Sequence, residues 1–118
     1  MATLAPAMFT FAHITGGGLA ANLARVLPPG LTAQVDRGTW TPGAVFAVLA
    51  QRGRIDRAEM EKTFNMGVGM VAIVAPEDTD RALAILTARH LDCWVLGTIN
   101  KGGKEGPRAK LVRQHPRF

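Results

Sequence analysis

Residues 13–19, His-Ile-Thr-Gly-Gly-Gly-Leu, combine a titratable imidazole, a hydroxyl group and three consecutive glycines. Glycine has no Cβ atom, so the backbone of Gly16, Gly17 and Gly18 can adopt positive φ angles and approach a ligand closely. A helix that follows would direct free N–H groups and the positive end of its dipole at this loop, which suits phosphate. The segment therefore predicts either a loop that binds an anion or a nucleotide-like ligand, or a plain tight turn.

Four side chains near the glycines could carry chemistry. His13 is either a general acid or base, because imidazole titrates near neutral pH, or a core histidine bonded to a backbone carbonyl. Thr15 either caps the helix or offers its hydroxyl to a ligand. Asn22 and Arg25 are three positions apart and share a helix face. Arg25 would clamp a phosphate or a carboxylate there, or form a surface salt bridge instead.

A second glycine segment, residues 65–69, has the sequence Asn-Met-Gly-Val-Gly. Asn65 could contact a ligand, and Gly67 and Gly69 would let that ligand approach the backbone. The structural alternative for this segment is a β-bulge.

Metal-binding spacing is absent from the sequence. His13, His90 and His115 lie far apart in three different predicted contexts. The single cysteine, Cys93, excludes an internal disulfide and a zinc site built on cysteines. We therefore expect no metal site in this chain.

Length and composition describe one small domain of 118 residues, of which 47% are hydrophobic. No run approaches the roughly 18 apolar residues that span a membrane. The first residues lack the basic region of a secretory signal. We expect a cytoplasmic protein that does not enter a membrane.

The net charge of +5 is confined to the C-terminal segment. Basic and acidic residues balance over residues 1–100, whereas residues 101–118 hold six basic residues and one acidic residue. Such a segment either attracts nucleic acid or a phosphorylated small molecule, or is simply a solvated end. Because no aromatic residue is interleaved with these charges before Phe118, we favour the solvated end and do not expect nucleic acid as a partner.

Hydrophobic periodicity and capping signals predict the elements that must position these groups. Helices are expected at residues 19–27, 42–53 with Thr41 as N-cap, 57–64 with Asp56 as N-cap, and 76–89. Strands are expected at residues 8–14, 31–36, the end of 65–74, 93–99 and 109–112. A turn at Gly102 and Gly103 suggests that the last two strands form a hairpin.

The resulting order, β-α-β-α-α-β-α-β-β, predicts an α+β fold in which helices pack on a mixed β-sheet. Together the motifs resemble the C-terminal domain of phosphoribosylformylglycinamidine cyclo-ligase, also called aminoimidazole ribonucleotide synthetase. The match runs in register from Phe11 to Ile99, with a weaker echo to Phe118. It is carried by residues 13–19, 22–23, 25–28, 30–31, 40–49, 59–60, 63–71 and 97–99.

This resemblance implies a ligase of purine biosynthesis. Such enzymes use ATP, accompanied by Mg²⁺, to activate the formyl amide oxygen of formylglycinamidine ribonucleotide, after which the amidine nitrogen closes the aminoimidazole ring. They are homodimers whose N-terminal domain supplies most of the ATP and metal contacts. The resemblance makes His13 the catalytic candidate. The implied substrate- or phosphate-binding residues are Thr15, Gly16, Gly17, Gly18, Asn22, Arg25, Asn65, Gly67 and Gly69.

The resemblance covers only part of a family member, which is about three times as long. We interpret residues 1–10 as an unmatched N-terminal stretch and residues 11–118 as a partial C-terminal domain that ends in a basic hairpin. We expect this fragment, which lacks the ATP-binding domain, to be inactive alone. The alternative is a non-catalytic module that binds a phosphorylated metabolite or forms a heterodimer.

Overall fold

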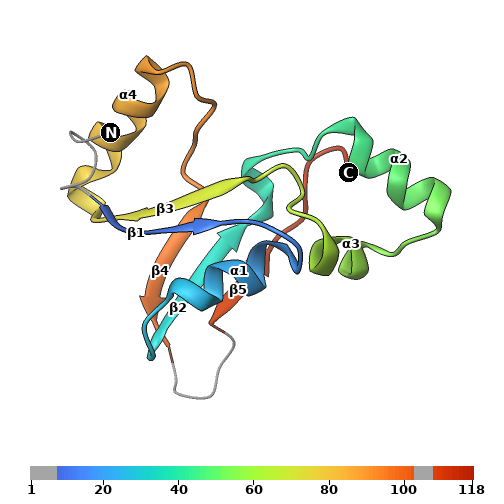
Figure 1. Ribbon diagram of the computed structural model, residues 1–118, viewed down its shortest axis with the longest axis horizontal. Helices are drawn as coiled ribbons and strands as arrows, with labels where there is room; N and C mark the ends of the chain where they lie inside the picture. Colours follow the sequence, from blue (N-terminus) through green and yellow to red (C-terminus); the bar gives the residue numbers. More distant parts are fainter. Residues whose placement is uncertain (1–7, 103–107) are drawn as a thin grey trace.

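The structure is a computed structural model that describes residues 8–102 and 108–118 (Figure 1). Its elements follow the predicted order, and the α+β fold class is confirmed. The strands are β1 (Met8–His13), β2 (Leu31–Asp36), β3 (Met70–Val74), β4 (Gly97–Lys101) and β5 (Ala109–Val112). The helices are α1 (Gly18–Val26), α2 (Ala44–Gly53), α3 (Arg57–Thr63) and α4 (Thr79–Ala88), with short 3-10 turns η2 (Arg37–Thr39) and η3 (Pro76–Asp78).

The described strands form two sheets. β1 pairs antiparallel with β3, and His13 lies opposite Met70 in that register. The second sheet has the order β4-β2-β5, in which β2 is antiparallel to β4 and parallel to β5. This second sheet is therefore mixed, as predicted, while β1 and β3 form a separate antiparallel pair.

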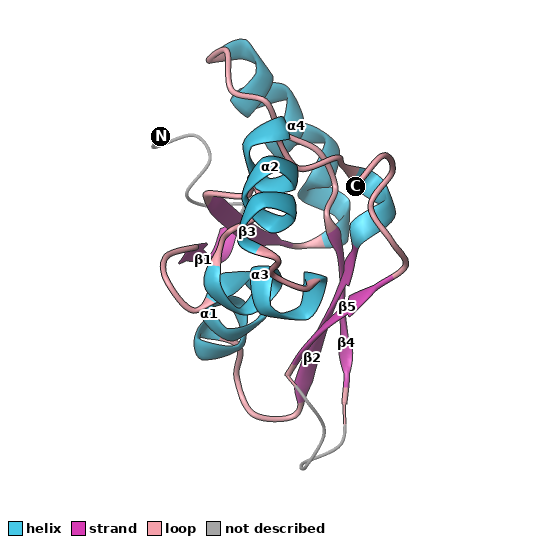
Figure 2. Cartoon of the chain, turned by 90° about the vertical axis from the view of Figure 1, so that its right-hand side faces the viewer, coloured by secondary structure: helices cyan, strands magenta, loops and turns pink. Residues whose placement is uncertain are grey.

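Helix α1 joins the two sheets because one of its faces is apolar. Leu19 and Leu23 lie on this face and are buried, as is Leu27 immediately after the helix. They pack in one core with Ala12 of β1, with Ile14 just after β1, and with Ala33 and Val35 of β2. Figure 2 shows α1 and α3 next to each other, beside the β4-β2-β5 sheet. The start of α1, where the glycines lie, is thus held between well-packed elements.

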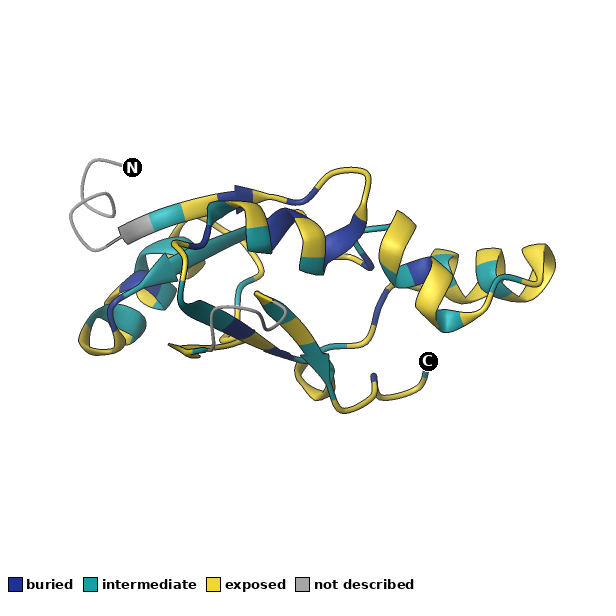
Figure 3. Cartoon of the chain, turned by 90° about the horizontal axis from the view of Figure 1, so that it is seen from below, coloured by how far each residue is buried: buried dark blue, intermediate teal, exposed yellow. Residues whose placement is uncertain are grey.

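Helix α2 extends away from this core. Phe46 contacts Phe64 after α3, with ring centroids 6.2 Å apart, but none of the residues of α2 is buried. Val45, Val48 and Leu49 are exposed, and the helix is largely solvent-facing in Figure 3.

The predicted C-terminal hairpin is wrong, because β4 and β5 lie on opposite edges of β2 and do not pair with each other. Both strands instead bond to β2, and β5 thereby brings Ala109 and Leu111 to the core. The predicted turn residue Gly103, together with Lys104, Glu105 and residues 1–7, lies outside the described residues.

Two element boundaries also differ from the prediction. The strand expected at 93–99 begins only at Gly97, opposite Val35. Trp94 instead packs at a tilt against Trp40, and its Nε1 donates to Thr39 Oγ1. Thr41 does not cap α2, since its hydroxyl donates to the Pro116 carbonyl and Gly43 takes the N-cap position. The predicted Asp56 cap is confirmed: its side chain accepts the Glu59 N–H at 2.9 Å.

Candidate functional site

The fold brings the two glycine segments together. Residues 15–18, the glycine loop, follow β1, and residues 65–69, the second glycine segment, precede its partner β3. The N–H of Ile14 donates to the carbonyl oxygen of Gly69 at 2.9 Å, which extends the pairing to the edge of both loops. Segments about 50 residues apart in the sequence are therefore brought near each other at one end of the β1–β3 pair.

The side chain of Asn22, on α1, forms hydrogen bonds with several residues of the glycine loop. Its Nδ2 lies 2.7 Å from the Gly18 carbonyl oxygen, 3.2 Å from that of Thr15 and 3.4 Å from that of Gly16. Its Oδ1 accepts from Thr15 Oγ1 and from Arg25 Nη1, each at 3.2 Å. Thr15 therefore does not cap the helix with its side chain, because the N-cap position is taken by Gly17. The Thr15 carbonyl oxygen instead accepts the Gly18 N–H.

The three glycines of the loop have different structural roles. Gly18 is buried at φ +87°, and a Cβ atom there would overlap the backbone carbonyl of Glu61. Gly17 is exposed at φ +99°, with the Arg25 guanidinium close to the position of its missing Cβ. Gly16 is exposed and has open space around it. Packing thus explains Gly18, whereas Gly16 and Gly17 present accessible backbone.

Arg25 is exposed beside this loop. Within the described part of the chain it forms no ion pair, and only one of its N–H groups is engaged, by Asn22, which leaves others for a ligand. A guanidinium next to open backbone N–H groups suits a phosphate or a carboxylate.

The second glycine segment is a tight turn, so the β-bulge alternative is wrong there. Asn65 Oδ1 accepts the N–H of Gly67 at 2.8 Å, and the positive φ angles of Met66 and Gly67 complete the turn. Trp40 Nε1 donates to the Met66 carbonyl oxygen at 2.9 Å, which ties the turn to the residue that follows η2. Gly67 and Gly69 are exposed.

His13 is exposed on the outer face of the β1–β3 ribbon, so the buried core histidine is wrong. In this register the same face carries Phe11 and Met70, whose exposed fractions are 40% and 57%. The imidazole makes no hydrogen bond to the residues that the structure describes. It is therefore accessible to a ligand at the end of the strand that leads into the glycine loop.

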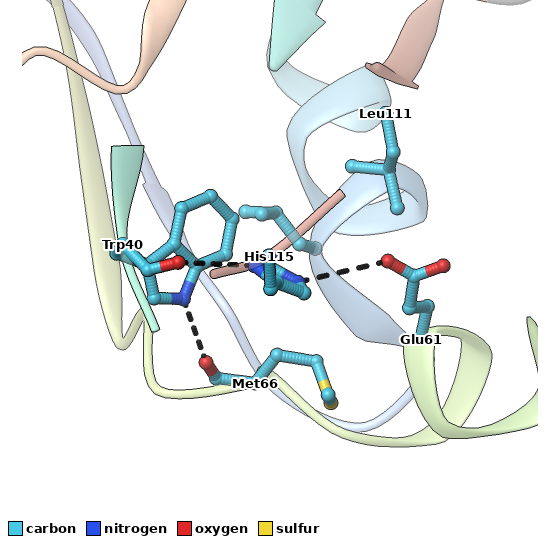
Figure 4. Close-up of a pocket in the computed structure, with 6 residues that line it drawn as sticks. Trp40, Glu61, Met66, Leu111 and His115 are labelled. Atoms are coloured by element: carbon cyan, nitrogen blue, oxygen red, sulfur yellow. Dashed lines mark hydrogen bonds and ion pairs between the residues drawn. The ribbon is translucent and has the colours of Figure 1, made fainter. Parts of the chain in front are cut away.

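Sequence reasoning missed a largely buried polar cluster, part of which Figure 4 shows, with His115 between Trp40 and Glu61. Arg37 Nη1 binds both carboxylate oxygens of Glu61, at 3.0 and 3.1 Å. His115 Nδ1 lies 3.0 Å from the Arg37 carbonyl oxygen and 3.2 Å from that of Trp40, so Nδ1 carries the proton. Its Nε2 lies 3.9 Å from Glu61, and Leu19 and Met66 line the same small recess.

Burial lowers the pKa of His115, because the interior disfavours the charged imidazolium. The two carbonyl oxygens and Glu61 oppose this effect, and Arg37 reinforces it. His115 is therefore neutral at neutral pH. Its neutral ring connects the C-terminal segment to η2 and α3, the elements beneath the glycine loop.

Among the residues that the structure describes, no three or more His, Cys, Asp and Glu side chains form a group that could hold a metal ion. No helix in the described ranges is long and apolar enough to cross a membrane.

Comparison with protein families identifies one match. Residues 9–110 match the family described as AIR synthase related protein, C-terminal domain. The matched region contains the glycine loop, the second glycine segment and all five described strands in whole or in part.

Individual relatives agree with this match. A Streptomyces fradiae protein, named provisionally as a phosphoribosylformylglycinamidine cyclo-ligase, is 57% identical over 86% of this chain and 56% of its own length. The phosphoribosylformylglycinamidine cyclo-ligase of Anaeromyxobacter dehalogenans strain 2CP-C is 47% identical over 87% of this chain and 30% of its own length. That of Caldicellulosiruptor bescii is 45% identical over 77% of this chain and 27% of its own length. The chain thus spans between about a quarter and about half of these relatives.

Proposed function

The chain belongs to the family of AIR synthase related proteins, whose C-terminal domain it matches, and on this basis we propose that it is the substrate-side part of an ATP-dependent cyclo-ligase. The reaction is the conversion of formylglycinamidine ribonucleotide to aminoimidazole ribonucleotide in purine biosynthesis. The names of the relatives support this activity. ATP and Mg²⁺ would bind mainly to a part of the enzyme outside this chain, and the whole enzyme would be a homodimer.

One observation carries the proposal at the level of residues: the exposed backbone of Gly16 and Gly17 lies beside Arg25 at the N-terminal end of α1. We propose that this loop holds the substrate phosphate through backbone N–H groups, the helix dipole and the guanidinium. Thr15 and Gly18 belong to the same loop, and Asn65, Gly67 and Gly69 form the adjoining wall. His13, accessible nearby, would contact the reacting part of the substrate or transfer a proton.

Replacing Arg25 by methionine tests the phosphate site. Charge-assisted hydrogen bonds to phosphate are among the stronger ones, so we expect R25M to weaken binding of ribose 5-phosphate by about tenfold or more. Binding is measured by titration of backbone amide resonances. Arg52, exposed on α2 away from the loop, provides the control R52M, which removes the same charge. Equal affinities for R25M and R52M would mean that the loop is not the phosphate site.

The chain alone is expected to bind phosphate without turnover, since ATP would be held by the part that the relatives possess beyond it. A cyclisation assay with ATP, Mg²⁺ and formylglycinamidine ribonucleotide measures this directly. Product formation by the purified chain would contradict the proposal that it is only the substrate-side part.

The exposed apolar face of the β1–β3 ribbon favours a second candidate function. Phe11 and Met70 on that face are suited to contact another polypeptide, as in a non-catalytic module that forms a heterodimer. Isolation of the chain in a stable complex with a full-length cyclo-ligase, lost on Phe11→Ser or Met70→Ser substitution, would favour this second function.

A further inference from the structure

We propose that Asn22 is a positioning residue: it holds the glycine loop in the shape that accepts phosphate and orients Arg25, without touching the phosphate itself. The inference rests on the proposed phosphate site. It changes the role expected for Asn22 from the sequence, which was direct contact with the ligand.

The Asn22 carboxamide has no hydrogen-bonding capacity left for a ligand. Its side chain is among the buried polar groups, with only 5% of the residue exposed. Its two N–H groups face the carbonyl oxygens of Thr15, Gly16 and Gly18, and its oxygen accepts from Thr15 and Arg25. An amide oxygen accepts two hydrogen bonds, so both sides of the group are occupied by the protein.

Asn22 also sets the direction of the peptide groups in the glycine loop. In a trans peptide unit, the carbonyl and the N–H of the next residue point in opposite directions. Asn22 Nδ2 donates to the carbonyl oxygens of Thr15 and Gly16, so both carbonyl groups point toward the Asn22 side chain. The N–H groups of Gly16 and Gly17 must then point away from Asn22, where both residues are exposed. Asn22 therefore sets which side of the loop can donate to an anion.

The same Asn22 side chain holds Arg25. The Asn22 oxygen binds Arg25 Nη1 at 3.2 Å, and Arg25 Nη2 lies next to Gly17. One carboxamide thus fixes the guanidinium relative to the outward-facing N–H groups. If both are needed for phosphate, removing Asn22 should disturb them together.

The test compares wild type, N22A, R25M and the double variant in titrations with inorganic phosphate, followed by backbone amide resonances. Alanine favours the helix at this position, and Thr15→Val provides a milder variant that removes only the exposed hydroxyl donor to Asn22. We expect N22A to weaken phosphate binding by about tenfold, and T15V by about threefold. The double variant should bind more weakly than R25M but lose less than the product of the two single losses, because Asn22 acts partly through Arg25 and partly through the loop N–H groups.

The spectra of the free chain give a readout that does not depend on a ligand. Positioning predicts that N22A shifts or broadens the Gly16 and Gly17 amide resonances and speeds their hydrogen exchange before phosphate is added. Unchanged loop resonances in N22A, or losses of affinity that multiply in the double variant, would overturn the positioning role. If the wild-type chain binds no phosphate, the proposed function fails, and the free-chain spectra still decide whether Asn22 holds the loop.

Discussion

Gly18→Ala is expected to destabilise the fold by about 3 kcal/mol or more. A left-handed backbone costs an L-residue roughly 1–2 kcal/mol, and forcing atoms into a packed contact costs roughly a further 1–3 kcal/mol. Both costs apply at Gly18, where φ is +87° and a Cβ atom would overlap the Glu61 carbonyl. Relief would require α1 to move away from α3, which exposes Leu19 of the core. Urea unfolding followed by circular dichroism measures the change.

Gly16→Ala is the matched control for this prediction, because it adds the same methyl group two positions earlier in the same loop. Gly16 has no atom within 4 Å of the position of its Cβ and is not among the residues with positive φ. We expect its free energy of unfolding to stay within about 0.5 kcal/mol of wild type. Equal stabilities for the two variants would contradict the close packing of α1 on α3.

The contrast between Gly16 and Gly18 shows what the sequence could not distinguish. Three consecutive glycines predict a loop that a ligand can approach, and that prediction treats the three alike. In the structure one glycine is required by packing against α3, a helix more than 35 residues later in the chain. Contacts at such separations leave no local pattern.

Features set by local chemistry were predictable. The Asp56 cap depends on a residue three positions away, and the apolar face of α1 on a repeat of 3.6 residues. The positions of β4 and β5 on opposite edges of β2 were not predictable. The turn at Gly102 suggested that the two strands pair with each other, whereas tertiary packing pairs each of them with β2. The site was predicted as two glycine segments, but their proximity emerges only from the β1–β3 pairing.

The Arg37–Glu61–His115 cluster is the clearest omission. Arg37 and Glu61 are 24 residues apart, and His115 is 78 residues from Arg37. His115 lies in a short basic segment that favoured a solvated end, yet its side chain is only 1% exposed. The rings of Trp40 and Phe118 pack edge-on against the imidazole of His115. In the sequence, the aromatic residue Phe118 at the end of the basic segment was the available signal that this segment is anchored.

Removing the guanidinium from this cluster is the second substitution with a large expected effect. Arg37→Ala leaves the Glu61 carboxylate, 12% exposed, without the guanidinium whose Nη1 contacts both of its oxygens. It also removes the donors to the Val112 and Leu111 carbonyl oxygens. Truncating one partner of a buried ion pair costs roughly 3–5 kcal/mol, and we expect about 3 kcal/mol here because the pair keeps some solvent contact.

Arg113→Ala is the control, since Arg113 also pairs with a carboxylate. Its Nε lies 3.6 Å from Asp36, but its side chain is 75% exposed. Exposed pairs contribute little, so we expect a loss below about 1 kcal/mol. If the two arginine variants unfold at the same urea concentration, the Arg37–Glu61 pair does not stabilise the fold as argued.

The pH dependence of the Arg37→Ala variant separates an electrostatic effect from lost packing. In wild type, burial holds the pKa of His115 below its usual value of 6.5. Neutral His115 therefore contributes its full share of stability above pH 6.5, and this contribution is lost as the pH falls below 6.5. Arg37 lowers the pKa of His115 and Glu61 raises it. In the R37A variant the effect of Glu61 is no longer opposed by Arg37, so the pKa of His115 rises and the imidazolium can pair with the Glu61 carboxylate. The deficit of R37A relative to wild type should therefore be smaller at pH 5.5 than at pH 7.5. A deficit that is the same at both values would show that the guanidinium acts by packing and not by its charge.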